Sequence, residues 1–257
     1  MKEVSVIIPI YKAELSAYEL HALTQISTVL HRYPLIVIHP EGLDLTSVLR
    51  QYPMLQTESF PSVFFQGIKG YNKLMLSAEL YERFSESEYI LIAQLDTYIF
   101  RDELSQWCQK GYDYIGAPWL EKPVYRLPLV KQMMHLSHLW KAFRGKPDKQ
   151  NLYNKVGNGG LSLRKVSTHL RAIHTHCKRI DHYLAQEHSH FYYEDVFWAT
   201  EIDTFRYPSA MEALHFAFDK YPAYCYKLTE GVLPFGCHAW SYRKMKSFWF
   251  PIIFPKK

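Results

Sequence analysis

Cysteine is scarce in this chain, and long apolar runs are absent. Its 257 residues include four cysteines that lie far apart and form no CxxC pair, so neither a disulfide framework nor a zinc ribbon is indicated. No window approaches the roughly 18 apolar residues that a membrane-spanning helix requires. The opening MKEVSVIIPIYKAEL lacks the cleavage site of a signal peptide. We therefore expect a cytoplasmic protein.

An excess of charge of one sign is also missing. Lys and Arg number 30 against 25 Asp and Glu, a net charge of +5. This is too mild for a nucleic-acid binder defined by charge, although it suits anionic ligands. Aromatic residues make up 16% of the chain, which excludes a mainly disordered protein.

Repeats and linkers are absent too, and the length suits one large domain. We expect a single domain over residues 1–240, with a nucleotide-binding half (1–110) and an acceptor or catalytic half (111–240). A basic, aromatic tail (241–257) follows it.

The first half alternates between apolar runs and helical patterns. Runs over 4–10, 35–38 and 89–95 predict strands that are buried on both faces. Ser16 and Glu19 form a capping box before one helical pattern, and apolar residues three and four apart predict a helix over 70–84. This order predicts an α/β domain with a largely parallel sheet.

The second half is less regular. Residues 129–145 form a basic amphipathic segment, and a glycine turn precedes a predicted strand over 161–164. Apolar residues four and three apart predict one helix over 165–186. His169 lies off the apolar stripe of that helix, so we expect it to face solvent.

Two motifs occur where an α/β sheet could bind a ligand. In QLDTY (94–98), an apolar strand delivers Asp96 to its carboxyl end, where open α/β sheets bind ligands; Asp96 equally suits a turn or a helix cap. In VGNGGLSLR (156–164), three glycines in four residues can let a ligand approach the main chain, or can form an ordinary hairpin turn.

Two further motifs place ionisable side chains among aromatic residues. In YEDVFW (193–198), the adjacent acids Glu194 and Asp195 raise each other's pKa if both are desolvated, which favours use as a general base. The alternative is a solvated helix start. In PFGCHAW (234–240), a glycine turn presents His238, although a lone histidine is more often structural than a ligand.

Taken in order, these motifs resemble those of GT-A nucleotide-sugar glycosyltransferases. VSVIIPIYK is similar to their opening strand and nucleotide loop, LIAQLDTYIF to their Asp-x-Asp element, and GNGGLSLR to the glycine-rich segment beside the sugar. YEDVFW is similar to the element with the catalytic base, and PFGCHAW to a late metal-binding histidine. With YDYIGAPW (112–119), the set most resembles an uncharacterised bacterial family of glycosyltransferase-like proteins linked to surface polysaccharides.

The resemblance spans residues 4–240 and implies the GT-A fold, which is a mixed, largely parallel sheet flanked by helices. It implies a single domain whose C-terminal half is irregular. It implies a metal-dependent, inverting, hexosyltransferase-like enzyme of polysaccharide biosynthesis. Such an enzyme moves a sugar from a nucleotide-diphosphate sugar, such as a UDP-sugar, to a glycan or lipid-linked acceptor. The sequence itself leaves inversion and retention of the anomeric configuration open.

The resemblance also implies roles for individual residues. Asp195 would be the catalytic base, and Glu194 would tune that base or bind the acceptor. Trp119 would offer a flat apolar face to a sugar, as part of the acceptor site. The implied donor-binding residues are Tyr11, Asn72, Lys73, Gln94, Asp96, Thr97, Gly159 and Gly160.

The implied divalent cation has an incomplete ligand set. Tyr98 stands where the family has the second Asp of Asp-x-Asp, so a two-carboxylate site is not assured. Asp96 and His238 would then hold Mn²⁺ or Mg²⁺, with diphosphate oxygens and water completing the shell. The histidine favours Mn²⁺.

Two other functions fit parts of the pattern. A non-catalytic protein that binds a nucleotide-sugar or glycan is favoured by Tyr98 and opposed by the Glu194-Asp195 pair. A nucleotidyltransferase would share the α/β sheet and the metal-binding Asp96, but no Gly-rich loop bearing Lys or Arg follows the first strand.

The tail SYRKMKSFWFPIIFPKK (241–257) combines basic and aromatic residues. Basic residues favour anionic headgroups and aromatic residues settle at the membrane interface, which predicts peripheral contact with the inner face of the plasma membrane. The alternative is that the aromatic residues pack onto the domain as a last piece of its core.

Overall fold

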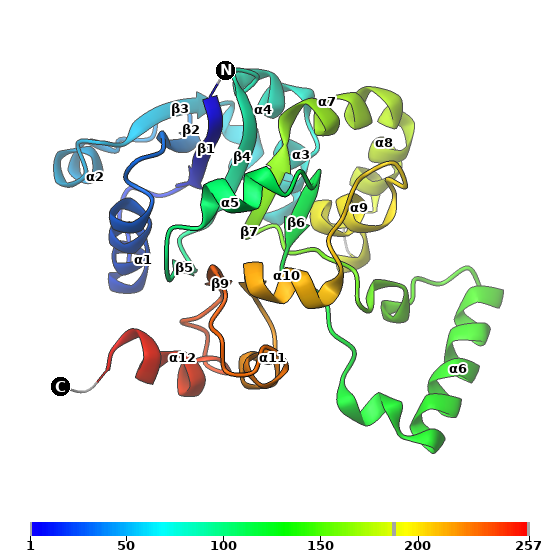
Figure 1. Cartoon of the computed structure of the whole chain (residues 1–257). Coiled ribbons are helices and arrows are strands. Elements are labelled where there is room, and N and C mark those ends of the chain that lie inside the picture. The colour runs from blue at the N-terminus through cyan, green and yellow to red at the C-terminus, as the bar shows by residue number, and fades with distance from the viewer. Residues whose placement is uncertain (1, 187–188, 256–257) are drawn as a thin grey trace.

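The computed structural model describes residues 2–186 and 189–255, arranged around one central sheet (Figure 1). Its six strands lie in the order β3-β2-β1-β4-β7-β6. They are β1 (Lys2–Pro9), β2 (Leu35–Pro40), β3 (Gln56–Phe60), β4 (Ser87–Ala93), β6 (Tyr114–Gly116) and β7 (Leu161–Lys165). The pairs β1–β2, β2–β3 and β1–β4 are parallel, while β7 runs antiparallel to both β4 and β6. The predicted α/β fold with a mainly parallel sheet is confirmed.

The central strands are apolar because helices cover both faces of the sheet. Val6, Ile7 and Ile8 of β1 are fully buried, as are Leu91 and Ile92 of β4, which is typical of parallel strands with both faces covered. The helices around the sheet are α1 (Ala17–Val29), α2 (Thr46–Gln51), α3 (Gly67–Met75), α4 (Ala78–Arg83), α5 (Leu104–Gln109), α7 (Val166–Thr175), α8 (Cys177–Ala185), α9 (Glu194–Thr200) and α10 (Ala210–Phe216).

Two of the predicted helices are each divided. The helix expected over 70–84 is α3 followed by α4, because the side chain of Ser77 accepts a hydrogen bond from Leu80 N and starts a new helix there. The helix expected over 165–186 is α7 followed by α8, with a break at His176. Periodicity does not reveal such breaks, because the apolar spacing continues across them.

The expectation for His169 is wrong. Its ring is fully buried and stacks on Tyr81, with the ring centroids 5.1 Å apart. Its Nδ1 lies 2.9 Å from the carbonyl oxygen of Lys165. Burial holds the pKa of His169 well below its ordinary value. The buried residues of α7 are Val166, His169, Ala172 and Ile173, so its buried face is turned toward His169 relative to the predicted apolar stripe.

A second, three-stranded sheet lies beyond the carboxyl ends of the central strands. It consists of β5 (Thr97–Ile99), β9 (Gly236–His238) and β8 (Ala217–Phe218), in the order β5-β9-β8. Thr97 is opposite His238 in this sheet. The pairing brings the chain after Asp96 beside the late histidine, although about 140 residues separate them in the sequence.

The tail forms α12 (Lys246–Ile253), which packs together with α11 (Pro222–Leu228) in a second, aromatic cluster. Trp249 is fully buried, and its ring centroid lies 5.5 Å from that of Phe100. For this residue, the alternative that the tail packs onto the domain as part of its core is therefore correct. The last two predicted basic residues, Lys256 and Lys257, lie outside the described residues. No helix in the described part of the chain is long and apolar enough to cross a membrane.

One helix stands apart from these layers. The helix α6 (Pro128–Phe143) projects away from the body of the molecule (Figure 1), within the segment predicted to be basic and amphipathic. Short 3₁₀ turns flank it, η2 (Pro123–Arg126) before it and η3 (Lys149–Leu152) after it; two others are η1 (Ser62–Phe65) and η4 (His190–Tyr192).

Candidate active site

Asp96 and His238 meet at the carboxyl edge of the central sheet. Asp96 follows β4 and His238 ends β9, and Nε2 of the histidine lies 3.2 Å from Oδ1 of the aspartate. On its other side, His238 Nδ1 lies 3.3 Å from Asp219 Oδ1. The two residues predicted to share a metal are thus brought together, with Asp219 added as a third member.

The charges in this row shift the pKa values of His238 and Asp96. Burial alone would lower the pKa of His238, but Asp96 and Asp219 together raise it to about 10. Burial would raise the pKa of Asp96, but His238, with hydrogen bonds from its own backbone and from Tyr242, keeps it below its usual value. Two carboxyl groups therefore flank a histidine whose charged form they favour.

The glycine turn fits closely against these groups. A Cβ atom on Gly160 would lie 2.2 Å from the His238 ring, and one on Gly159 would lie 2.0 Å from Glu194 Oε1. Asn158, at φ 75°, accepts a hydrogen bond from Gly160 N and places its amide 3.1 Å from His238 Nδ1. In this chain, the glycines make room for two side chains of the site; the predicted approach of a sugar to the backbone stays a prediction.

The two acids of α9 point in different directions. Asp195 lines a cavity, and its carboxylate accepts hydrogen bonds from the backbone of Val196 and Gly159. Burial is the main cause that raises the pKa of Asp195 above its ordinary value. Glu194 is buried instead, and it does not line that cavity. The candidate base therefore lies on the open side of the helix.

Glu194 forms a buried ion pair with Arg164 of β7. Arg164 is 0% exposed and its Nη2 lies 3.0 Å from Glu194 Oε1, while Nη1 and Nε donate to Tyr81 and Ser162. Burial raises the pKa of Glu194 to about 7, and the attraction of Arg164 opposes that rise. Asn72 accepts a hydrogen bond from the Glu194 backbone N–H. These contacts fix the start of α9 to the central sheet.

The cavity beside Asp195 has a volume of about 190 Å³. Trp119, predicted to bind the acceptor, forms part of its wall, together with Tyr193 and Tyr221. Lys122, Lys149 and Lys220 add positive charge. Tyr221 has φ 57°, a strained backbone conformation of the kind that clusters at functional sites. The wall offers aromatic faces and cations around one carboxylate, which suits a sugar or phosphate ligand.

The other predicted donor residues are placed differently. Tyr11, at the end of β1, and Lys73, on α3, are exposed. Thr97 is buried and donates to Gln94 O, and Gln94 N donates to Gly160 O, so both stabilise the turn that carries Asp96. Asn72 is also buried, with its oxygen committed to Glu194 N.

The residues present fit a divalent cation in part. Asp96 Oδ1 is buried and has only the ion-pair contact with His238, without a hydrogen bond of normal geometry. Carboxylate oxygen and imidazole suit Mn²⁺ or Mg²⁺. Within residues 2–186 and 189–255, no three His, Cys, Asp or Glu side chains are grouped as a complete metal site. Tyr98 instead stacks on His21, 5.8 Å away between ring centroids.

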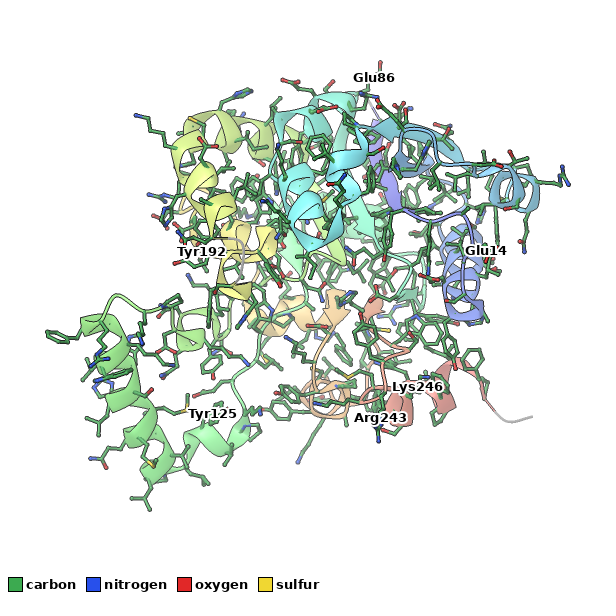
Figure 2. All side chains as sticks on the ribbon, turned by 180° about the vertical axis from the view of Figure 1, so that it is seen from behind. Glu14, Glu86, Tyr125, Tyr192, Arg243 and Lys246 are labelled. Carbon is green, nitrogen blue, oxygen red and sulfur yellow. The ribbon has the colours of Figure 1, made fainter. Side chains whose placement is uncertain are left out.

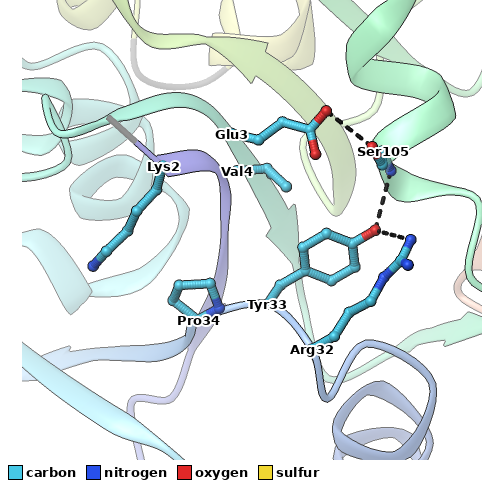
Figure 3. Close-up of a pocket in the computed structure, with 7 residues that line it drawn as sticks. All are labelled: Lys2, Glu3, Val4, Arg32, Tyr33, Pro34 and Ser105. Carbon is cyan, nitrogen blue, oxygen red and sulfur yellow. Dashed lines mark hydrogen bonds between the residues drawn. The ribbon is translucent and has the colours of Figure 1, made fainter.

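A second cavity, of about 350 Å³, lies at the amino end of β1 and is lined by Lys2, Arg32 and Tyr33, among others (Figure 3). Its polar groups bind one another: Ser105 Oγ donates to Glu3, and Tyr33 OH accepts from Ser105 N and from Arg32. Because ligands of open α/β sheets bind at the carboxyl ends of the strands, we place the site at Asp195.

Several residues of the site were missed in the sequence. Arg164 had a signal in the sequence, because it is a charged residue within an otherwise buried strand. Arg164 and Ser162 are two residues apart, so they lie on the same face of that strand. Asn158 had a signal too, as a residue type that tolerates positive φ within a glycine turn. Asp219 and Tyr242 had none, because only the fold of the C-terminal segment brings Asp219 to His238 and Tyr242 to Asp96.

Comparisons with known proteins show the family and the fold of the chain. A family model described as "Protein of unknown function (DUF5672)" matches residues 54–238, which include Asp96, the glycine turn, Asp195 and His238. Among curated proteins, no sequence matches the chain.

Solved structures of glycosyltransferases share the fold. An active-site mutant of LgtC superposes with a TM-score of 0.58 at 14% identity, covering 97% of this chain and 93% of that one. Mouse xyloside xylosyltransferase 1 gives 0.51 at 14% identity, covering 92% and 97%. GlyE of Streptococcus pneumoniae TIGR4 gives 0.52 at 10% identity, covering 93% of this chain and 54% of that one. The fold is therefore that of the GT-A glycosyltransferases.

Proposed function

The chain belongs to the DUF5672 family, and we propose that it is a glycosyltransferase, which moves a sugar from a nucleotide-diphosphate sugar to an acceptor hydroxyl. The observation that carries the proposal is the position of Asp195. Its carboxylate lines a cavity walled by Trp119, at the carboxyl edge of a GT-A sheet, and hydrogen-bonds the glycine turn that packs against His238.

The proposed chemistry is a displacement at the anomeric carbon. The acceptor oxygen forms a bond to that carbon, the bond from carbon to the diphosphate oxygen breaks, and Asp195 takes the acceptor proton. A base with a raised pKa transfers protons efficiently near neutral pH. Direct displacement of this kind inverts the anomeric configuration. Glu194 acts as a positioning residue, because its ion pair with Arg164 fixes the helix that carries Asp195.

Asp96 and His238 would hold a divalent cation, which supplies positive charge against the growing charge of the leaving diphosphate. Lys220 and Lys149, in the cavity wall, add charge of the same sign. A nucleotide-sugar donor is supported by the fold, because LgtC has been solved with donor and acceptor sugar analogs. A glycan or lipid-linked acceptor in bacterial surface-polysaccharide synthesis is part of the same proposal.

A non-catalytic binding protein is the second candidate. The observation that favours it is Tyr98, whose ring packs in the aromatic cluster with Trp240 instead of supplying a second carboxylate beside Asp96. Such a protein would keep affinity for the donor and lose turnover.

A screen of nucleotide-diphosphate sugars, with and without Mn²⁺, separates the two candidates. Release of nucleoside diphosphate that increases with Mn²⁺ and with an added sugar acceptor supports transfer. Donor binding by calorimetry without any release supports the binding protein. If the protein binds no donor and releases no nucleoside diphosphate from any donor, both candidates are contradicted.

A further inference from the structure

The helix α6 contacts the segment that follows it through a mixed face, on which Val130, Met134, His138 and Lys141 are half-buried. His138 Nδ1 and Lys141 Nζ each lie 3.0 Å from the carboxylate of Asp148, which is buried. Gln150 donates a hydrogen bond to Met134 O. An amphipathic helix of a globular protein normally turns its apolar face to the core. In α6, a longer apolar stripe lies on the exposed side instead.

The apolar face of α6 is therefore exposed. Its residues follow one another at spacings of four, three, four and three, which keeps them on one side of a helix. They are Leu129, Met133, Leu136, Trp140 and Phe143. Their exposed fractions lie between 51 and 91%, and none of the sixteen described residues of the helix is buried. An exposed apolar stripe of this length marks an interaction surface.

The charge around the stripe is of one sign. Residues 122–147 contain six Lys and Arg and no Asp or Glu. Two of these cations lie over the Trp140 ring: the Arg144 guanidinium at 4.5 Å and the Lys146 ammonium at 5.5 Å from its centroid. A Trp ring with cations beside it suits the boundary between acyl chains and anionic headgroups.

We propose that α6 docks the protein onto an anionic membrane surface, with the stripe among the acyl chains and the basic residues at the headgroups. A helix with an apolar stripe and a basic surround, without the length of a membrane span, is the interfacial type. A second copy is a poorer occupant, because pairing two stripes would bring two sets of six like charges together.

Docking through α6 would bring the candidate site to the membrane. The turns η2 and η3 on either side of the helix supply Tyr125, Lys149 and Leu152 to the cavity that Asp195 lines. In Figure 1, α6 and α12 both lie in the lower half of the molecule, on opposite sides of it. If the proposed glycosyl transfer holds, on which this step rests, the acceptor is lipid-linked and reaches Asp195 from the bilayer.

The tail offers basic residues but no exposed tryptophan. Trp249 is buried and cannot insert, but Arg243 and Lys244 are exposed, and Figure 2 shows Arg243 and Lys246 in the lower half of the molecule. We therefore assign insertion to α6, with electrostatic support from the tail.

The test is co-sedimentation of the full chain with vesicles of equimolar phosphatidylcholine and phosphatidylglycerol, and with phosphatidylcholine alone. The wild-type chain should pellet with the anionic vesicles. The variant M133S/L136S/F143S should bind at least about tenfold more weakly, and the charge reversal R144E/K146E should weaken binding by a similar factor. The matched control M54S/V63S/I68S removes three exposed apolar side chains elsewhere and should bind like wild type.

Fluorescence gives a second readout that does not depend on pelleting. Of six tryptophans, Trp107, Trp198, Trp240 and Trp249 are buried, whereas Trp140 is exposed. Anionic vesicles should shift the emission to shorter wavelengths, and Trp140→Phe should abolish the shift while the protein still pellets.

Three outcomes would overturn the proposal: no binding of the wild-type chain to anionic vesicles, binding unchanged in M133S/L136S/F143S, or a dimer in solution that this triple variant dissociates. Donor turnover on a soluble acceptor, measured on the same variants, should stay at the wild-type level. A failure of membrane docking with turnover intact would contradict this inference alone. Docking without any turnover would contradict the proposed function alone.

Discussion

Gly160 is the residue where the backbone and the site's chemistry are most closely linked. A methyl group there would lie 2.2 Å from the His238 ring, so Gly160→Ala must displace the ring or the turn. We expect the affinity for a nucleoside diphosphate with Mn²⁺, measured by calorimetry, to fall at least about tenfold. The control Gly42→Ala has nothing within 4 Å; it should lower stability slightly, because its φ is +80°, and leave binding unchanged. Equal affinity in wild type and Gly160→Ala would contradict the assignment.

Asp96 should couple nucleotide binding to the metal. Its buried Oδ1 has no normal hydrogen bond and faces His238, so a cation can replace that contact. Calorimetry of a nucleoside diphosphate should show tighter binding with Mn²⁺ than without, and Asp96→Ala should remove the difference. The control Asp44→Ala removes an exposed carboxylate at the start of α2. Affinity that is independent of metal and unchanged in Asp96→Ala would favour a metal-free site that uses Lys or Arg.

A buried ion pair joins α9 to β7. Removing Arg164 leaves Glu194 without its partner in the core, so Arg164→Met should lower the free energy of unfolding by about 3–5 kcal/mol. The double variant Arg164→Met/Glu194→Leu leaves neither charge and should recover part of that loss. Urea unfolding measures both. A double variant less stable than the single one would show that the pair is not the cause.

The elements that could be predicted are those with a strong local pattern. The strands β1, β2 and β4 contain short apolar runs, and β7 follows a glycine turn; each lies within a few residues of its predicted position. The breaks at Ser77 and His176 were not predicted, because apolar spacing continues through both. The orientation of α6 was also hidden, since an amphipathic pattern does not say which face meets the body.

The candidate site was predictable where its residues lie in a strong local sequence pattern. Asp96, His238 and Asp195 lie in short motifs with a local signal, whereas Asp219 comes to the site only through the pairing of β8 with β9. The different directions of Glu194 and Asp195 depend on Arg164, which lies 30 residues earlier in the sequence. Sequence spacing cannot show which of two adjacent acids is drawn into the core.

For the molecule as a whole, activity and stability should respond to pH in opposite directions through Asp195. Burial raises its pKa above the ordinary 3.8, so the base becomes protonated as the pH falls through that raised value, and kcat/KM should decline there. The free energy of unfolding changes in the opposite direction. The raised pKa of Asp195 favours the folded state at low pH, and this contribution is lost as the pH rises through the pKa of the folded state. A pH profile of kcat/KM beside urea unfolding at each pH checks both. An acid limb at the ordinary Asp value would contradict the burial argument.

The central claim is that Asp195 removes the acceptor proton during sugar transfer. Its most direct test is the turnover of the best donor with a sugar acceptor, compared between wild type, Asp195→Asn and the control Asp203→Asn, which changes an exposed aspartate. We predict that Asp195→Asn keeps the fold and the donor affinity but lowers turnover by about 10²-fold or more, whereas Asp203→Asn is unchanged. Turnover of Asp195→Asn close to the wild-type value would contradict the account.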